Sequence, residues 1–216
     1  MRIIGDVHGK WAMYKNLIRN CEESVQIGDM GVGFFGHKDM RPADPAHVFF
    51  PGNHDNPETC ESHPNCLGYW GEHKGMFFFG GASSIDAHLR TEGRDWWPRE
   101  QMPMADMYEA QAFYEDMKTD IVLSHDAPFS ICGMIQEASP ESRGWGPVRE
   151  TRTTVCLDEL FRFHKPKIWI CGHWHSDIIF PPVEGTTFII LGELSYLDIN
   201  LKSNKYGRIN VPFTEE

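Results

Sequence analysis

Residues 167–175 read KIWICGHWH, an apolar run that ends in a glycine and continues into two histidines. In an extended chain, side chains two residues apart point to the same side, so His173 and His175 can face one point. Gly172 lets the backbone turn tightly where the run ends, and open α/β sheets bind their ligands at the ends of their strands. The stretch therefore predicts a strand that presents two imidazoles to a candidate metal site.

Four earlier predicted strands also end on polar residues. The runs at 2–5, 24–27, 48–50 and 121–123 are followed by DVHG at 6–9, GD at 28–29, PGNHD at 51–55 and SHD at 124–126. One such block is weak evidence, because a single Asp or Asn beside a strand is usually a turn or capping residue. Five blocks together favour one shared site.

The remaining periodicity predicts an α/β fold. Helical spacing of apolar residues predicts helices over 10–20, 106–117 and 154–164, the last with Thr154 as its N-cap, and 76–79 reads as a further strand. After His175, β-rich runs at 178–180, 187–191 and 196–201 are separated by Pro and Gly, which predicts a β meander. Strand–helix units followed by strands predict mixed sheets with helices outside. A chain of 216 residues suits a single domain over 1–216.

Three long segments, 31–45, 86–102 and 127–153, fit no regular element. Long loops in compact domains are often functional, so we expect the last two to form a rim that contacts the substrate. Each of their arginines can equally be a solvated side chain. The substrate-binding candidates are Arg90, Arg94, Arg149 and Arg152.

Composition is that of a soluble globular protein, with 41% hydrophobic and 24% charged residues. The net charge of −11 argues against stable binding of duplex nucleic acid. The N-terminal residues carry no secretory signal and no apolar run is long enough to cross a membrane, so no membrane partner is expected. Six scattered cysteines indicate free thiols in the cytoplasm, and the spacing of Cys60, His63 and Cys66 lacks an evident fourth zinc ligand. The oligomeric state stays open.

The polar residues at the strand ends form a set of candidate metal ligands. Carboxylate, amide and imidazole donors in this mixture suit borderline divalent ions, and their number exceeds what one tetrahedral ion needs. We therefore expect two neighbouring ions with one bridging carboxylate, manganese being the first expectation and iron, zinc, cobalt, nickel or magnesium the alternatives. The candidate ligands are Asp6, His8, Asp29, Asn53, His125, His173 and His175.

The ordered blocks D-x-H, G-D, G-N-H-D, H and G-H-x-H resemble the signature of the calcineurin-like metallophosphoesterase superfamily, from Asp6 to His175. The resemblance implies two mixed β-sheets packed as a sandwich with flanking helices. It also implies that Asp6, His8 and His175 bind one metal, that Asn53, His125 and His173 bind the other, and that Asp29 bridges them. His54 matches the family's catalytic histidine. Its neighbour Asp55 either orients that imidazole or caps the following turn.

The resemblance implies hydrolysis of phosphomonoesters or phosphodiesters by attack of a metal-bound hydroxide, with His54 acting on the leaving group. Aromatic residues in the long loops suggest a small, nucleotide-like substrate. The alternatives are a phosphoserine or phosphothreonine phosphatase and a non-catalytic metal-binding scaffold. The first would call for the G-D-x-x-D-R-G block of the superfamily's phosphoprotein phosphatase branch, which this chain lacks, since residues 28–34 read GDMGVGF. The second conflicts with the complete set of candidate ligands.

Overall fold

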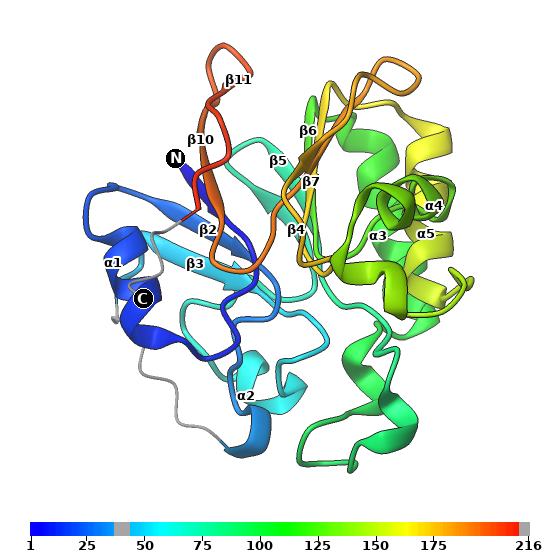
Figure 1. Cartoon of the computed structure of the whole chain (residues 1–216). Coiled ribbons are helices and arrows are strands. Elements are labelled where there is room, and N and C mark those ends of the chain that lie inside the picture. Colours follow the sequence, from blue (N-terminus) through cyan, green and yellow to red (C-terminus); the bar gives the residue numbers. More distant parts are fainter. Residues whose placement is uncertain (37–43, 212–216) are drawn as a thin grey trace.

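Two β-sheets pack face to face in the computed structural model, which describes residues 1–36 and 44–211 (Figure 1). The first sheet has the order β11 (Lys205–Tyr206), β10 (Tyr196–Asn200), β1 (Arg2–Ile4), β2 (Ser24–Ile27) and β3 (His47–Phe50). The second has the order β4 (Trp70–His73), β5 (Met76–Phe79), β6 (Ile121–Ser124), β7 (Ile168–Cys171), β9 (Thr187–Ile190) and β8 (Ile178–Ile179). Parallel pairing joins β1, β2 and β3 in the first sheet and β5, β6, β7 and β9 in the second. Antiparallel strands are added at one edge of the first sheet and at both edges of the second.

Helices cover the outer faces of the two sheets (Figure 1). Helix α1 (Trp11–Ile18) packs on the first sheet, whereas α3 (Met104–Met117), α4 (Phe129–Ala138) and α5 (Arg152–Phe163) pack on the second. Helix α2 (Pro57–Glu61) and the 3-10 turns η1 (Phe34–Gly36), η2 (Ala87–Leu89), η3 (Pro98–Glu100) and η4 (Glu141–Gly144) lie in the connections. The expected sandwich of two mixed sheets with flanking helices is confirmed.

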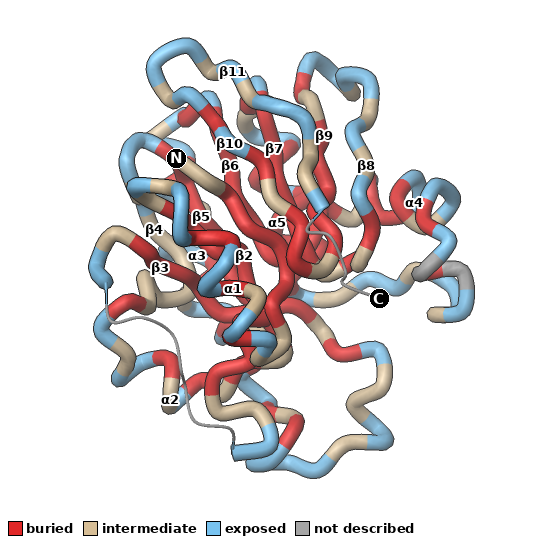
Figure 2. The backbone as a smooth tube through the Cα atoms, turned by 60° about the vertical axis from the view of Figure 1, so that its left-hand side comes forward, coloured by how far each residue is buried: buried red, intermediate tan, exposed pale blue. Residues whose placement is uncertain are grey.

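Three apolar layers hold this arrangement together. The middle layer lies between the sheets and includes Ile27 and Phe50 from the first sheet and Leu123 and Ile170 from the second. The two outer layers lie beneath the helices. Every residue of β2, β3, β5, β6 and β7 is buried (Figure 2). This burial explains the continuous apolar sequences of β5 and β7, because strands covered on both faces do not alternate, whereas β2 also buries the polar Ser24 and Gln26. Each large side chain buried in this way contributes about 1.5–3 kcal/mol.

The structure corrects three expectations about regular elements. Residues 127–153 are not one long loop, because α4 lies within them and buries Ile131, Cys132 and Ile135 against the second sheet. The terminal strands do not form a meander, because β9 pairs in parallel with β7 while β10 crosses to the other sheet and pairs with β1. At α5 the N-cap is Thr151, whose hydroxyl accepts a bond from the backbone N–H of Thr154 in a capping box.

Two further expectations concern loops and membranes. Segment 31–45 is described only in part, because residues 37–43 lie outside the described residues. Across residues 1–36 and 44–211, no helix has both the length and the apolar character needed to span a bilayer.

Candidate metal centre

The predicted ligands converge because they follow parallel strands whose carboxyl ends meet. Asp6 follows β1, Asp29 follows β2 and Asn53 follows β3 in the first sheet, while His125 follows β6 and His173 follows β7 in the second. Ligands of open α/β sheets bind at this end of the strands. Each sheet therefore contributes part of one site.

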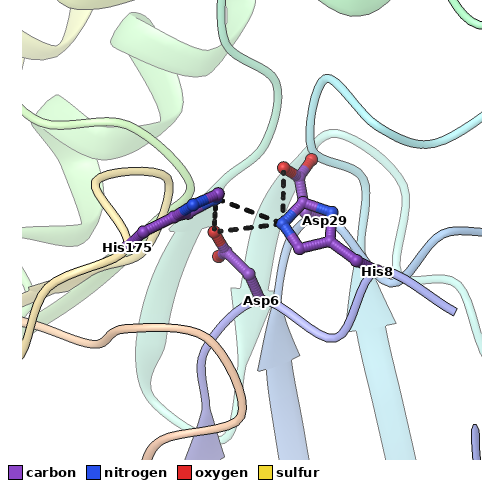
Figure 3. Close-up of side chains that lie close together, drawn as sticks. All are labelled: Asp6, His8, Asp29 and His175. Atoms are coloured by element: carbon purple, nitrogen blue, oxygen red, sulfur yellow. Dashed lines mark hydrogen bonds and ion pairs between the residues drawn. The ribbon is translucent and has the colours of Figure 1, made fainter. Parts of the chain in front are cut away.

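Four of these residues form a first cluster, shown in Figure 3. Asp6 Oδ2 lies 3.2 Å from His175 Nε2 and 3.9 Å from His8 Nε2. The second carboxylate is that of Asp29, whose Oδ2 is 3.9 Å from His8 Nε2. The two imidazoles present their Nε2 atoms to each other at 3.1 Å. All four side chains therefore offer a ligand atom to the same small space.

Asp29, His125 and His173 form a second cluster. Asp29 Oδ1 lies 3.2 Å from His125 Nε2, and the amide oxygen of Asn53 lies 3.1 Å from the same nitrogen. His125 Nδ1 is 3.0 Å from the carbonyl oxygen of Ile27, a contact that orients the ring. Asp29 belongs to both clusters and uses one carboxylate oxygen towards each.

The backbone at the site adopts conformations that few residues take. His8, Asp29, His173 and His175 have φ values of 48°, 58°, 66° and 51°, in the left-handed region. Such residues cost of order 1–3 kcal/mol each and cluster at functional sites. Neighbouring glycines make room for the ligands: a Cβ on Gly28 would overlap the His125 ring, and one on Gly52 would overlap the Asp29 carboxylate.

The donor set fits divalent cations. Asp6 Oδ2 is buried without a hydrogen-bond partner. Burial opposes protonation of His125, but Asp29 and Asp6 outweigh it and raise its pKa to about 10. A proton on His125 thus offsets the buried carboxylates in the absence of metal. Oxygen and imidazole donors around one space suit borderline divalent ions, which would replace that proton. Among the described residues, no such cluster forms around Cys60, His63 and Cys66.

His54 and Arg90 lie together at the mouth of the site. Arg90 Nη2 lies 2.5 Å from His54 Nε2 and 2.7 Å from Asp86 Oδ1. On the other side of the ring, His54 Nδ1 is 3.3 Å from Asp29 Oδ2. Burial lowers the pKa of His54 to about 4, and His8 and Arg90 act in the same direction against Asp29. The imidazole is therefore neutral here, and the Arg90 guanidinium is the permanent positive charge at the mouth.

Asp55 ties two loops of the site together. Its carboxylate accepts hydrogen bonds from the backbone N–H groups of Met30, Gly31, Val32 and Gly52, at 2.7–3.2 Å. These partners belong to the turns that carry Asp29 and Asn53. Within the described residues, no hydrogen bond links the Asp55 carboxylate to the His54 ring. Neither alternative for Asp55 describes these contacts, because the partners lie before Asp55 in the chain and not in the turn that follows it.

Sequence reasoning missed a hydrogen-bonded chain behind Asn53. The Asn53 amide nitrogen donates to Ser84 Oγ at 3.1 Å, and Ser84 Oγ donates to Glu100 Oε2 at 2.6 Å. Arg90 Nη1 also donates to Ser84 Oγ at 3.3 Å. A carboxylate only accepts, so Glu100 sets the direction of the whole chain and turns the Asn53 amide oxygen towards His125.

The four predicted substrate-binding arginines have different surroundings. Arg90 lines the pocket of the site, and Arg149 lines a neighbouring cavity. Arg94 is 61% exposed and pairs with Asp95 at 3.2 Å. Arg152 is exposed at the start of α5 and contacts the carbonyl oxygen of Gln101 at 3.5 Å. The structure brings Arg90 into the site, and it does not bring Arg94 or Arg152 there.

Comparison with known proteins identifies a family. The sequence model described as Metallophos, calcineurin-like phosphoesterase, matches residues 2–177. No protein of curated function matches the chain.

Among solved structures, a putative 5'-nucleotidase from Staphylococcus aureus in complex with alpha-ketoglutarate has a TM-score of 0.52 at 12% identity, covering 100% of this chain and 54% of that one. The protein TT1561 of Thermus thermophilus has a TM-score of 0.49 at 12% identity, covering 97% of this chain and 98% of that one. Phosphopantetheinyl hydrolase from Mycobacterium tuberculosis has a TM-score of 0.46 at 14% identity, covering 89% of each chain. At 12% identity, the likeness to the first of these structures bears on the fold alone.

Proposed function

The chain belongs to the calcineurin-like phosphoesterase family, and from that premise we propose that it hydrolyses phosphomonoesters or phosphodiesters with two divalent cations. The observation that carries the proposal is Asp29, a buried carboxylate shared by two adjacent clusters of potential metal ligands. The complete donor set favours an enzyme over a non-catalytic scaffold. Residues 28–34 lack the phosphoprotein phosphatase block, which favours small phosphoesters over phosphoproteins.

Each cation would be held by residues from both sheets. One would take Asp6, His8 and His175, the other Asn53, His125 and His173, with Asp29 between them. When bound, such cations lower the pKa of water towards 7 and offset negative charge on phosphoryl oxygens. Manganese is our first expectation, since the mixture of carboxylate, amide and imidazole donors does not favour soft-metal chemistry.

Arg90 and His54 would act on the phosphoester from the mouth of the site. The guanidinium, 2.5 Å from His54 Nε2, can pair with a phosphoryl oxygen through its fork of donors. Arg90 is one of the groups that lower the pKa of His54, and by moving to the phosphoryl group it would release His54 Nε2. The freed nitrogen would then take up a proton from solvent and donate it to the leaving-group oxygen. Asp55 would hold the turns that position Asp29 and Asn53, without touching the substrate.

The wider setting follows from the same features. We take residues 1–216 as one domain acting on a small phosphoester. The scattered spacing of the cysteines is not that of a disulfide framework, and we propose the cytoplasm.

The test is hydrolysis of p-nitrophenyl phosphate and its bis ester with Mn²⁺, before and after chelation by EDTA. We expect His54→Ala to lower kcat about 10²–10⁴-fold, the usual contribution of a positioned acid or base. His73→Ala is the matched control, because His73 lies at the end of edge strand β4. Failure to turn over either ester, or full activity of His54→Ala, would reject the proposal.

A further inference from the structure

A second cavity, of about 380 Å³, adjoins the candidate metal centre, and we call it the side cavity. The pocket at the centre itself is smaller, about 230 Å³, and contains Asp29 and His54. Ile85, Trp145 and His173 line both spaces. A molecule with its phosphate at the centre can therefore extend past Trp145 into the side cavity.

Two stacked indoles form one wall of the side cavity. The rings of Trp145 and Trp174 lie 5.6 Å apart with an interplanar angle of 26°. Trp174 is 6% exposed and its indole N–H donates to Asp126 Oδ1 at 3.1 Å, so the Trp174 ring is fixed in place. Trp145 rests on this support and meets the His173 ring edge-on at 5.9 Å. The wall is a preformed flat surface beside the metal centre.

Polar groups complete the lining. Asp126 also lines the cavity, but it is 3% exposed and its Oδ1 already accepts the Trp174 indole N–H and the backbone N–H of Ala127, at 3.1 Å and 2.7 Å. Gln136 of α4 donates to the carbonyl oxygen of Gly146 at 2.6 Å and so anchors the loop that carries Trp145. Apolar Val148 lines the cavity from the same loop.

This lining suits a group that is flat, apolar on its faces and polar at its edge, since Gln136, Arg149 and Thr151 line the cavity beside the two indoles. The volume falls within the range of about 300–1,000 Å³ typical of small-molecule sites, and exceeds the need of a bare phosphate. We propose that the side cavity receives the base of a nucleotide whose phosphate is hydrolysed at the metal centre. The inference rests on the proposed function for the position of the phosphate.

Adenosine 5'-monophosphate and ribose 5-phosphate form a matched pair of substrates, because they differ only in the base. We expect kcat/KM with Mn²⁺ to be roughly 5- to 150-fold higher for the nucleotide, the range expected from stacking one base on an aromatic side chain. Val148→Trp, which fills the side cavity, should bring this ratio close to one. Val155→Trp is the matched control, because Val155 is 40% exposed on α5 and lies outside the cavity lining.

A calorimetric titration with adenosine gives a readout without turnover. Wild-type protein and Val155→Trp should bind adenosine, and Val148→Trp should bind it at least tenfold more weakly. A nucleotide to ribose phosphate ratio near one in wild type, no adenosine binding at millimolar concentration, or binding that Val148→Trp leaves unchanged would each overturn the inference. If neither phosphoester is hydrolysed, the proposed function fails, while the adenosine titration still decides the side cavity.

Discussion

Replacement of Asp55 by alanine should substantially lower the free energy of unfolding. The carboxylate is fully buried and is the acceptor for four backbone N–H groups of two turns. A buried donor left without its acceptor costs about 1–3 kcal/mol. If water entering the space satisfies about half of the donors, the loss is about 2–6 kcal/mol, against a total stability of about 5–15 kcal/mol for a typical protein.

The assay is urea unfolding of metal-free protein in EDTA, so that cation binding does not contribute. With a slope of about 2 kcal/mol/M, a loss of about 4 kcal/mol lowers the midpoint by about 2 M. Asp55→Asn, which keeps one acceptor oxygen, should lie between wild type and Asp55→Ala. Asp116→Ala, at an exposed position of α3, should change stability by less than about 0.5 kcal/mol. A loss below about 1 kcal/mol for Asp55→Ala, the least expected from even one unpaired donor, would refute this reasoning.

Three other measurements test separate parts of the structure. Glu100→Gln should weaken Mn²⁺ binding about 10-fold in calorimetry, because it removes the charged end of the hydrogen-bonded chain that orients Asn53. Glu61→Gln, at an exposed position, should bind Mn²⁺ like the wild type. Equal Mn²⁺ affinities of Glu100→Gln and wild type would contradict this role. Mn²⁺ at about 100 times its dissociation constant should stabilise the EDTA-treated protein by about 2.7 kcal/mol in thermal unfolding, and an unchanged melting temperature would speak against a metal centre. A thiol reagent should label only the half-buried Cys21 and Cys66 in the native protein and all six thiols in urea, so labelling of further cysteines before unfolding would conflict with this packing.

The position of the ligands was predictable because one rule applied five times. Buried strands are recognisable as apolar runs, and the ends of parallel strands must meet, so the polar residues that follow them had to be neighbours. The same rule extends to Ser84, which comes shortly after β5 and the glycines at 80 and 81. Extending the rule to β5 would have pointed to the segment that contains Ser84.

Other features depend on tertiary contacts that leave no local pattern. Glu100 orients Asn53 through a hydrogen bond to Ser84, which lies in a different loop. Neither the neighbours of Glu100 nor its spacing in the sequence indicate this role. Helix α4 is short and carries Gly133 in its interior, which weakens its helical signal even though Ile131 and Ile135 are four residues apart. β10 has strand-like alternation, but alternation does not tell which sheet the strand will join.

The division of the ligands between the two sheets has a mechanical consequence. In the proposed assignment, the first cation takes Asp6 and His8 from one sheet and His175 from the other, and the second takes Asn53 from one and His125 and His173 from the other. Neither half of the sandwich can load a cation by itself. Metal binding would therefore link the two sheets at the strand ends that carry the ligands. Any motion that separates the sheets there would release both ions together.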